Sequence, residues 1–148
     1  MRLQGNDWWK NADAHLTVGN LIEEYEWMKH TKGEFVIRLH HAERAGDHYD
    51  LHLDGETWAI RKGVPKTSGT KVLAIMTAYH SPTERQIKVI EEGYGKGTYE
   101  IIDEGEMTII DQTPNKIAFQ LQGNIYRGNY TLVNTPTYGK NAWLLIKQ

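Results

Sequence analysis

Apolar and polar residues alternate along much of the chain from residue 34 onward. Within residues 35–40 and again within 48–53, apolar side chains occupy every second position. Successive side chains of a β-strand point to opposite faces, so this alternation predicts two strands with one apolar face each. Asp54-Gly55 is typical of a two-residue hairpin turn and predicts a return strand over residues 56–62. An antiparallel sheet is therefore expected in this part of the chain.

Further short strands are predicted as far as the C-terminus. Apolar-rich segments lie at residues 71–79, 98–102, 106–110, 116–122, 125–133 and 142–147. Turn-forming sequences separate the later ones, namely Asp103-Glu-Gly105, Pro114-Asn115 and Gly123-Asn124. Many short strands with turns at short intervals favour a mainly β protein, either a sandwich or a barrel.

Two segments have helical patterns. Apolar residues recur at helical spacing over 17–30, and Gly33 is expected to end that helix. Ser81-Pro-Thr-Glu84 predicts a short helix near 81–91, with serine as the N-cap, proline at the first position and glutamate three residues after the cap. The glycine-rich run at 93–97 ends it. We expect an N-terminal helical extension over 1–33, packed on a single barrel unit over 34–148.

Composition limits the classes of function. The 148 residues suit one domain with its own core, and 17 basic residues nearly balance 19 acidic ones. Net charge therefore does not indicate a nucleic-acid partner, and phosphate contacts must come from a local patch. The absence of cysteine excludes disulfides, thiolate metal sites and cysteine nucleophiles. No apolar run approaches the ~20 residues that span a bilayer, and no long apolar signal segment precedes the domain, so we expect a cytoplasmic protein with no membrane association.

Four of the seven histidines fall between residues 40 and 52. On the predicted strand 48–53, His48, Asp50 and His52 share one face. Two imidazoles and a carboxylate are a ligand set for a divalent transition metal. His40 lies on the polar side of its own strand and can face the same space if the two strands pair. Three such ligands leave positions for water or substrate, which is typical of a catalytic metal site; a solvated polar face is the alternative.

Other polar residues are weaker candidates. His80 directly precedes a predicted helix start, where unpaired N–H groups favour anions, so it could contact a phosphate or donate a proton. An exposed turn residue is the alternative for His80. The candidate phosphate or nucleic-acid contacts are Arg38, Arg44, Arg61, Lys62 and Lys71. Scattered cations of this kind are also common on ordinary solvated surfaces.

An ordered series of motifs runs through most of the chain. It comprises Phe35-Val-Ile, His40-His-Ala42, His48-Tyr-Asp50-Leu-His-Leu-Asp54-Gly55, Trp58-Ala-Ile-Arg-Lys-Gly63 and the terminal Trp143-Leu-Leu-Ile-Lys147. In this order the motifs resemble the 3′-phosphoesterase domain of bacterial DNA ligase D and its stand-alone relatives. The resemblance implies a compact antiparallel β-barrel with flanking helices. It also implies a metal-dependent phosphoesterase of DNA end repair, which removes 3′-phosphates and trims 3′-terminal ribonucleotides.

The same resemblance implies residue roles and partners. The family's metal ligands fall on His40, His48 and Asp50, and its phosphate-contacting histidine falls on His80. The expected cofactor is Mn²⁺, with Zn²⁺ or Co²⁺ as alternatives because a set of two histidines and an aspartate suits several metals. The expected partners are a primer-template 3′ end and a separately encoded DNA ligase, and the expected state is a monomer.

Three positions depart from the family's pattern. An arginine two residues after the aspartate is His52 here, an arginine of a later strand is Val72, and a tyrosine after the phosphate-contacting histidine is Glu84. On the ligand face, His52 is a candidate catalytic group, a second phosphate contact or an extra ligand. The departures keep two alternatives open. One is a weakened or inactive module that binds nucleic-acid ends, and the other is a hydrolase of the same fold with a different substrate.

Overall fold

The computed structural model describes residues 31–91 and 96–148. They form nine strands: β1 (Thr31–Ala42), β2 (Gly46–Leu53), β3 (Glu56–Ile60), β4 (Lys71–Thr77), β5 (Val89–Ile90), β6 (Gly97–Thr113), β7 (Lys116–Gln122), β8 (Arg127–Asn134) and β9 (Ala142–Lys147). Two 3-10 turns, η1 (Glu84–Gln86) and η2 (Pro136–Tyr138), complete the secondary structure. The described residues contain no α-helix.

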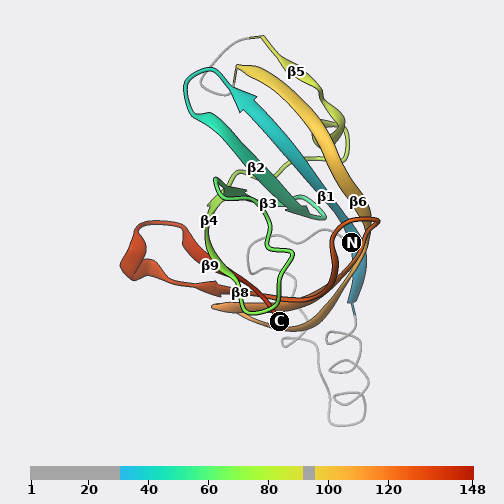
Figure 1. The fold of residues 1–148 in the computed structure, drawn as a ribbon, viewed down its shortest axis with the longest axis vertical. Helices are drawn as coiled ribbons and strands as arrows, with labels where there is room; N and C mark the ends of the chain where they lie inside the picture. The colour runs from blue at the N-terminus through green and yellow to red at the C-terminus, as the bar shows by residue number, and fades with distance from the viewer. Residues whose placement is uncertain (1–30, 92–95) are drawn as a thin grey trace, which may run out of the picture.

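Eight of these strands close into an antiparallel barrel (Figure 1). Their order is β1-β2-β3-β4-β9-β8-β7-β6, and β1 pairs with β6 to complete the ring, while the short β5 joins β6 from outside. Closure gives β1 a hydrogen-bonded neighbour on both sides, which removes its exposed edge. Side chains on β1 and β2 therefore project from a backbone that is fixed on both sides.

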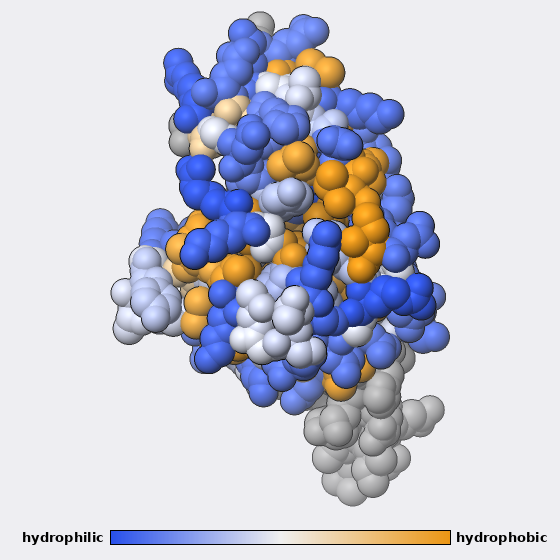
Figure 2. Space-filling view, in the orientation of Figure 1, coloured by the Kyte–Doolittle hydropathy of each residue, from blue (hydrophilic) through white to orange (hydrophobic). Residues whose placement is uncertain are grey.

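Alternation sends one set of side chains into the barrel. The buried apolar cluster includes Phe35, Ile37, Leu51, Leu53, Trp58, Ile60, Met107, Ile109, Phe119, Leu121, Tyr130, Leu132 and Leu145. On β1, β2 and β3 the intervening residues face outward. The surface in Figure 2 is hydrophilic over much of the visible face, with apolar side chains showing between the polar ones. The core thus lies inside the barrel, and the histidine-rich face of β2 lies outside it.

Most of the predicted strands are confirmed. Residues 116–122 and 142–147 coincide with β7 and β9, and the Asp54-Gly55 turn joins β2 to β3. Asp54 adopts a positive φ of 52°, as such a turn requires. A Cβ at Gly55 would collide with the ring of Tyr79, so glycine also permits the segment after β4 to pack against this hairpin.

The predicted helix near 81–91 is wrong. The capping box itself forms, because the Glu84 N–H donates to Ser81 Oγ (3.2 Å) and the Ser81 N–H donates to Glu84 Oε1 (3.0 Å). Only the 3-10 turn η1 follows it, and Ile87 is already extended, with φ −65° and ψ 134°. Arg38 donates to the carbonyl groups of Glu84 (3.0 Å) and Ile87 (3.2 Å). Carbonyl groups that a longer helix would use are thus bound by the barrel.

The predicted turn at residues 103–105 is also wrong, because β6 runs through it without a break. Asp103 accepts four backbone N–H groups at 2.8–3.0 Å, one from β6 itself and three from the loop between β7 and β8. The donors are Glu104, Asn124, Ile125 and Tyr126. Although desolvation opposes it, this set of hydrogen bonds lowers the pKa of the Asp103 carboxyl. The carboxylate fixes the loop between β7 and β8 instead of forming a turn of its own.

Some predictions fall on residues that the structure does not describe. The helix over 17–30 and most of the glycine-rich run at 93–97 lie outside the described residues. Gly33, the predicted helix end, lies within β1. Within residues 31–91 and 96–148, no helix is long and apolar enough to cross a membrane.

Candidate metal centre

The pairing of β1 with β2 brings three ligating side chains together. His40 lies opposite His48, and Asp50 follows two residues later on β2. His48 Nε2 lies 3.2 Å from both His40 Nδ1 and Asp50 Oδ1, and His40 Nδ1 lies 4.0 Å from Asp50 Oδ2. Ligand atoms at ~2.0–2.2 Å from one metal ion lie roughly 3.0–3.6 Å apart. Two of the three separations already fit a shared ion, and the third is slightly long.

Hydrogen bonds orient the imidazole ring of His48. Its Nδ1 lies 3.2 Å from the Gly46 carbonyl oxygen, which can accept the ring N–H and leave Nε2 directed at Asp50. The hydrogen bond to Asp50 raises the pKa of the His48 imidazole, although partial burial opposes this effect. A proton would therefore compete with any metal ion bound at this nitrogen.

Tyr99 of β6 supports the cluster from the other side of β1. It pairs with His40 in the sheet, and the two rings stack at 3.9 Å between centroids. The guanidinium carbon of Arg38 lies 3.8 Å from the centroid of the same tyrosine ring. Burial, reinforced by the charge of Asp50, raises the pKa of the Tyr99 hydroxyl, so the phenol stays neutral. No sequence pattern identified Tyr99, because the pairing of β1 with β6 joins distant segments.

The three candidate ligands line a pocket of about 400 Å³ on the outer face of the barrel. Besides the ligands, its lining includes His80, Tyr99 and Arg61. The volume falls within the range that small-molecule sites occupy. The cluster is therefore accessible to a ligand and is not sealed inside the protein.

His80 reaches this pocket from the segment that follows β4. Its backbone N–H donates to the Gly55 carbonyl (2.8 Å), and its Nδ1 lies 2.9 Å from Thr57 Oγ1. Two contacts with the β2–β3 hairpin thus hold His80 at the wall of the pocket that the three candidate ligands also line. The sequence predicted His80 as a site residue, and the structure brings it to the same pocket. No pattern in the sequence identified Thr57 as a site residue.

His52 lies on the ligand face of β2 but does not line the pocket. It is fully buried, its Nε2 accepts from Arg38 Nε (3.0 Å), and its Nδ1 lies 2.7 Å from Thr57 Oγ1. Burial, together with the positive charge of Arg38, lowers the pKa of His52 to about 2, so the ring is neutral. Both ring nitrogens are bonded inside the protein, and neither faces a substrate or a metal in this arrangement.

The five predicted cationic contacts do not form one patch. Arg38 is fully buried, and burial lowers its pKa. Arg61 is exposed and lines the pocket. Arg44, Lys62 and Lys71 are exposed but lie outside the pocket lining. Arg61 is therefore the one predicted cation of these five that lines the pocket, and the buried Arg38 brings its charge close to the cluster through Tyr99.

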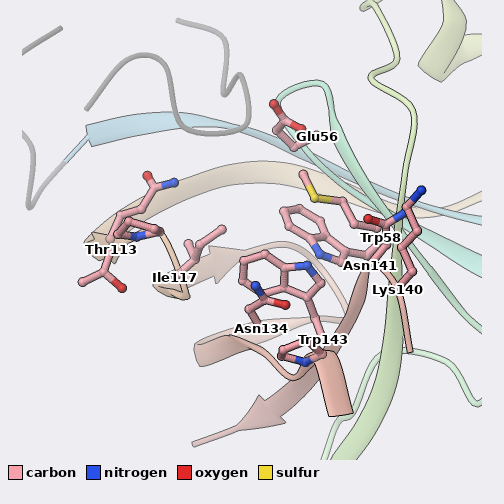
Figure 3. A pocket seen from close by; sticks show the side chains of 12 residues that line it. Glu56, Trp58, Thr113, Ile117, Asn134, Lys140, Asn141 and Trp143 are labelled. Atoms are coloured by element: carbon pink, nitrogen blue, oxygen red, sulfur yellow. The ribbon is translucent and has the colours of Figure 1, made fainter. Parts of the chain in front are cut away.

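A second pocket, of about 350 Å³, contains none of the predicted site residues (Figure 3). Trp58 and Trp143 form part of its lining and meet edge-on, with ring centroids 5.9 Å apart. Both tryptophans belong to the barrel core. This second pocket therefore brings none of the predicted site residues together.

Comparison with known proteins agrees with this geometry. The family model of the DNA Ligase D 3′-phosphoesterase domain matches residues 38–134, which is more than half of the chain. The matched span contains His40, His48, Asp50 and His80. No curated protein matches the chain. The ordered motifs, the barrel and the matched span lead to one conclusion: the chain belongs to the DNA ligase D 3′-phosphoesterase domain family.

Proposed function

We propose that this protein is a metal-dependent phosphoesterase that processes nucleic-acid 3′ ends in DNA repair. It would remove 3′-phosphates and trim 3′-terminal ribonucleotides. The observation that carries the proposal is the cluster of His40, His48 and Asp50, which opens into a pocket with His80. Family membership supports the choice of a 3′ end as substrate.

The residues of the pocket have different roles in the proposed reaction. His40, His48 and Asp50 would hold a divalent cation, for which we propose Mn²⁺ because of the family; Zn²⁺ or Co²⁺ would suit the same donors. When bound, such an ion polarises phosphoryl oxygens and lowers the pKa of water. His80 offers an imidazole to the phosphoryl group, and Arg61 adds positive charge at the pocket.

Phosphate release from a 3′-phosphate primer-template in the presence of Mn²⁺ tests the proposal. We expect turnover by the wild-type protein and none by His48→Ala or Asp50→Ala. His41→Ala is the matched control, because His41 is adjacent in sequence, exposed, and paired with Asp47 at 3.1 Å. It should keep full activity. Full activity in either ligand variant would contradict the assignment.

A nucleic-acid-end binding module is the second candidate. The observation that favours it is the internal bonding of His52, which replaces an arginine expected at the phosphate and leaves Arg61 as the pocket's cation. A gel-shift assay with the same primer-template separates the two candidates. End binding with no turnover in Mn²⁺, Co²⁺ or Zn²⁺ would identify a binding module.

A further inference from the structure

Four polar side chains form a continuous hydrogen-bonded chain that ends at the pocket. Arg38 Nε lies 3.0 Å from His52 Nε2, His52 Nδ1 lies 2.7 Å from Thr57 Oγ1, and Thr57 Oγ1 lies 2.9 Å from His80 Nδ1. The β2–β3 register places His52 directly opposite Thr57. Arg38, His52 and Thr57 are fully buried, whereas His80 is partly exposed at the pocket wall.

Each group in this hydrogen-bonded series donates to the next, from Arg38 towards His80. Arg38 can only donate, so His52 Nε2 accepts, and the single proton of that ring lies on Nδ1. The Nδ1–H donates to Thr57 Oγ1, whose own proton can go to His80 Nδ1 at 2.9 Å or to the Gly55 carbonyl at 3.2 Å. The Gly55 carbonyl already accepts the His80 N–H at 2.8 Å. A hydroxyl that accepts a hydrogen bond also becomes a stronger donor, which favours the shorter contact to His80.

We propose that Thr57 is a positioning residue that sets the tautomer of His80. The Thr57 hydroxyl donates to Nδ1, so the neutral ring carries its proton on Nε2, the nitrogen left for the pocket. From there the N–H donates to a phosphoryl oxygen of the bound ester. This inference deepens the proposed function and rests on it.

The hydrogen-bonded series from Arg38 to His80 also explains why residue 52 is a histidine. A side chain there must accept from Arg38 and donate to Thr57 at the same time, and a neutral imidazole does both. Arginine has no acceptor and could not receive the Arg38 N–H. His52 is therefore a second positioning residue, acting through Thr57 and not by touching the substrate.

Ring ¹⁵N–¹H correlation spectra of the metal-free protein test the tautomer of His80 directly. The His80 signals are assigned with His80→Asn, at a pH where the ring is neutral. We expect the wild-type proton on Nε2, a mixture of tautomers in Thr57→Val, and recovery of the Nε2 form in Thr57→Ser. Thr131→Val is the matched control, because this buried threonine of β8 bonds Gln148 at 3.0 Å. It should leave His80 unchanged.

Turnover of the 3′-phosphate primer-template gives the second readout. Loss of a group that orients a site residue typically costs about 10- to 100-fold. We expect this loss in kcat for Thr57→Val, near-wild-type kcat for Thr57→Ser and Thr131→Val, and thermal unfolding that shows every variant folded.

The outcomes separate this inference from the proposed function. A wild-type proton on Nδ1, or an unchanged tautomer in Thr57→Val, overturns the positioning role whatever the turnover. If Thr57→Val changes the tautomer but keeps wild-type kcat, the role in catalysis is overturned. If the wild type has no turnover while the tautomer depends on Thr57, the hydrogen-bonded arrangement stands and the phosphoesterase assignment fails.

Discussion

Replacing Arg38 by methionine is expected to release the segment that follows β4 from the barrel. Methionine keeps much of the apolar volume but has no donor. The arginine donates to His52 Nε2 and to the carbonyl groups of Glu84 and Ile87. In the variant the two carbonyl groups can turn to water, because Glu84 and Ile87 are exposed. The Nε2 acceptor of His52 is buried and cannot turn to water.

The magnitude follows from these three contacts. Leaving the buried His52 nitrogen unsatisfied costs about 1–3 kcal/mol, and each of the other two bonds contributes about 0.5–1.5 kcal/mol net. Removing the buried guanidinium offsets part of this cost, because its Nη2 is buried without a hydrogen-bond partner. We expect a net loss of about 2–4 kcal/mol in the free energy of unfolding.

Urea unfolding and amide hydrogen exchange measure the two parts of this prediction. The Arg85, Gln86 and Ile87 amides bond within the released segment and should exchange faster in the variant. Arg44→Met removes an exposed arginine and should change stability by less than about 0.5 kcal/mol. Wild-type stability and unchanged exchange in Arg38→Met would refute a clamping role for the guanidinium.

Further predictions concern charge. The pKa of His48 is raised in the folded state, so protonation of His48 should stabilise the metal-free protein. This stabilisation should be complete below pH ~6.5 and should disappear as the pH rises through the folded-state pKa. Urea unfolding of Asp50→Asn at several pH values should show no such pH dependence. Mn²⁺ affinity, measured by calorimetry, should fall as pH drops through the same pKa, because protons compete for His48. His52→Arg should lower stability without raising kcat, because two guanidinium groups at about 4 Å repel by ~4 kcal/mol at an effective dielectric constant near 20; higher activity in this variant would contradict the bonding described for Arg38. Asp103→Asn should cost about 2–4 kcal/mol in urea unfolding, because an amide nitrogen cannot accept the N–H groups bonded to Oδ2.

Local patterns predicted the features that depend on neighbouring residues. Alternation on 48–53 placed His48 and Asp50 on one face, and Asp54-Gly55 predicted the hairpin. These signals are reliable here because side-chain direction in a strand follows from sequence position alone. His48 and Asp50 could therefore be placed together from the sequence, whereas the position of His40 beside them depended on the pairing of β1 with β2.

Contacts between distant segments were not visible in the sequence. Alternation shows which face His52 occupies, but not that Arg38 and the segment after β4 bury it. Thr57 and Tyr99 enter the site through strand pairing, which a single sequence does not specify. The helix predicted near 81–91 failed for the same reason, since a correct local capping signal was overridden by hydrogen bonds from β1.

The opposite orientation of neighbouring residues in β1 and β2 has a consequence for how this domain can change over evolution. Phe35 and Leu51 pack inside the barrel, whereas His40 and Asp50 project from its outer face. Substitutions on the outer face can alter the chemistry while the interior packing stays intact. Insertion or deletion of one residue within β2 would instead exchange the two sets, turning imidazoles inward and leucines outward. The length of this strand should therefore tolerate less change than the identity of its outward residues.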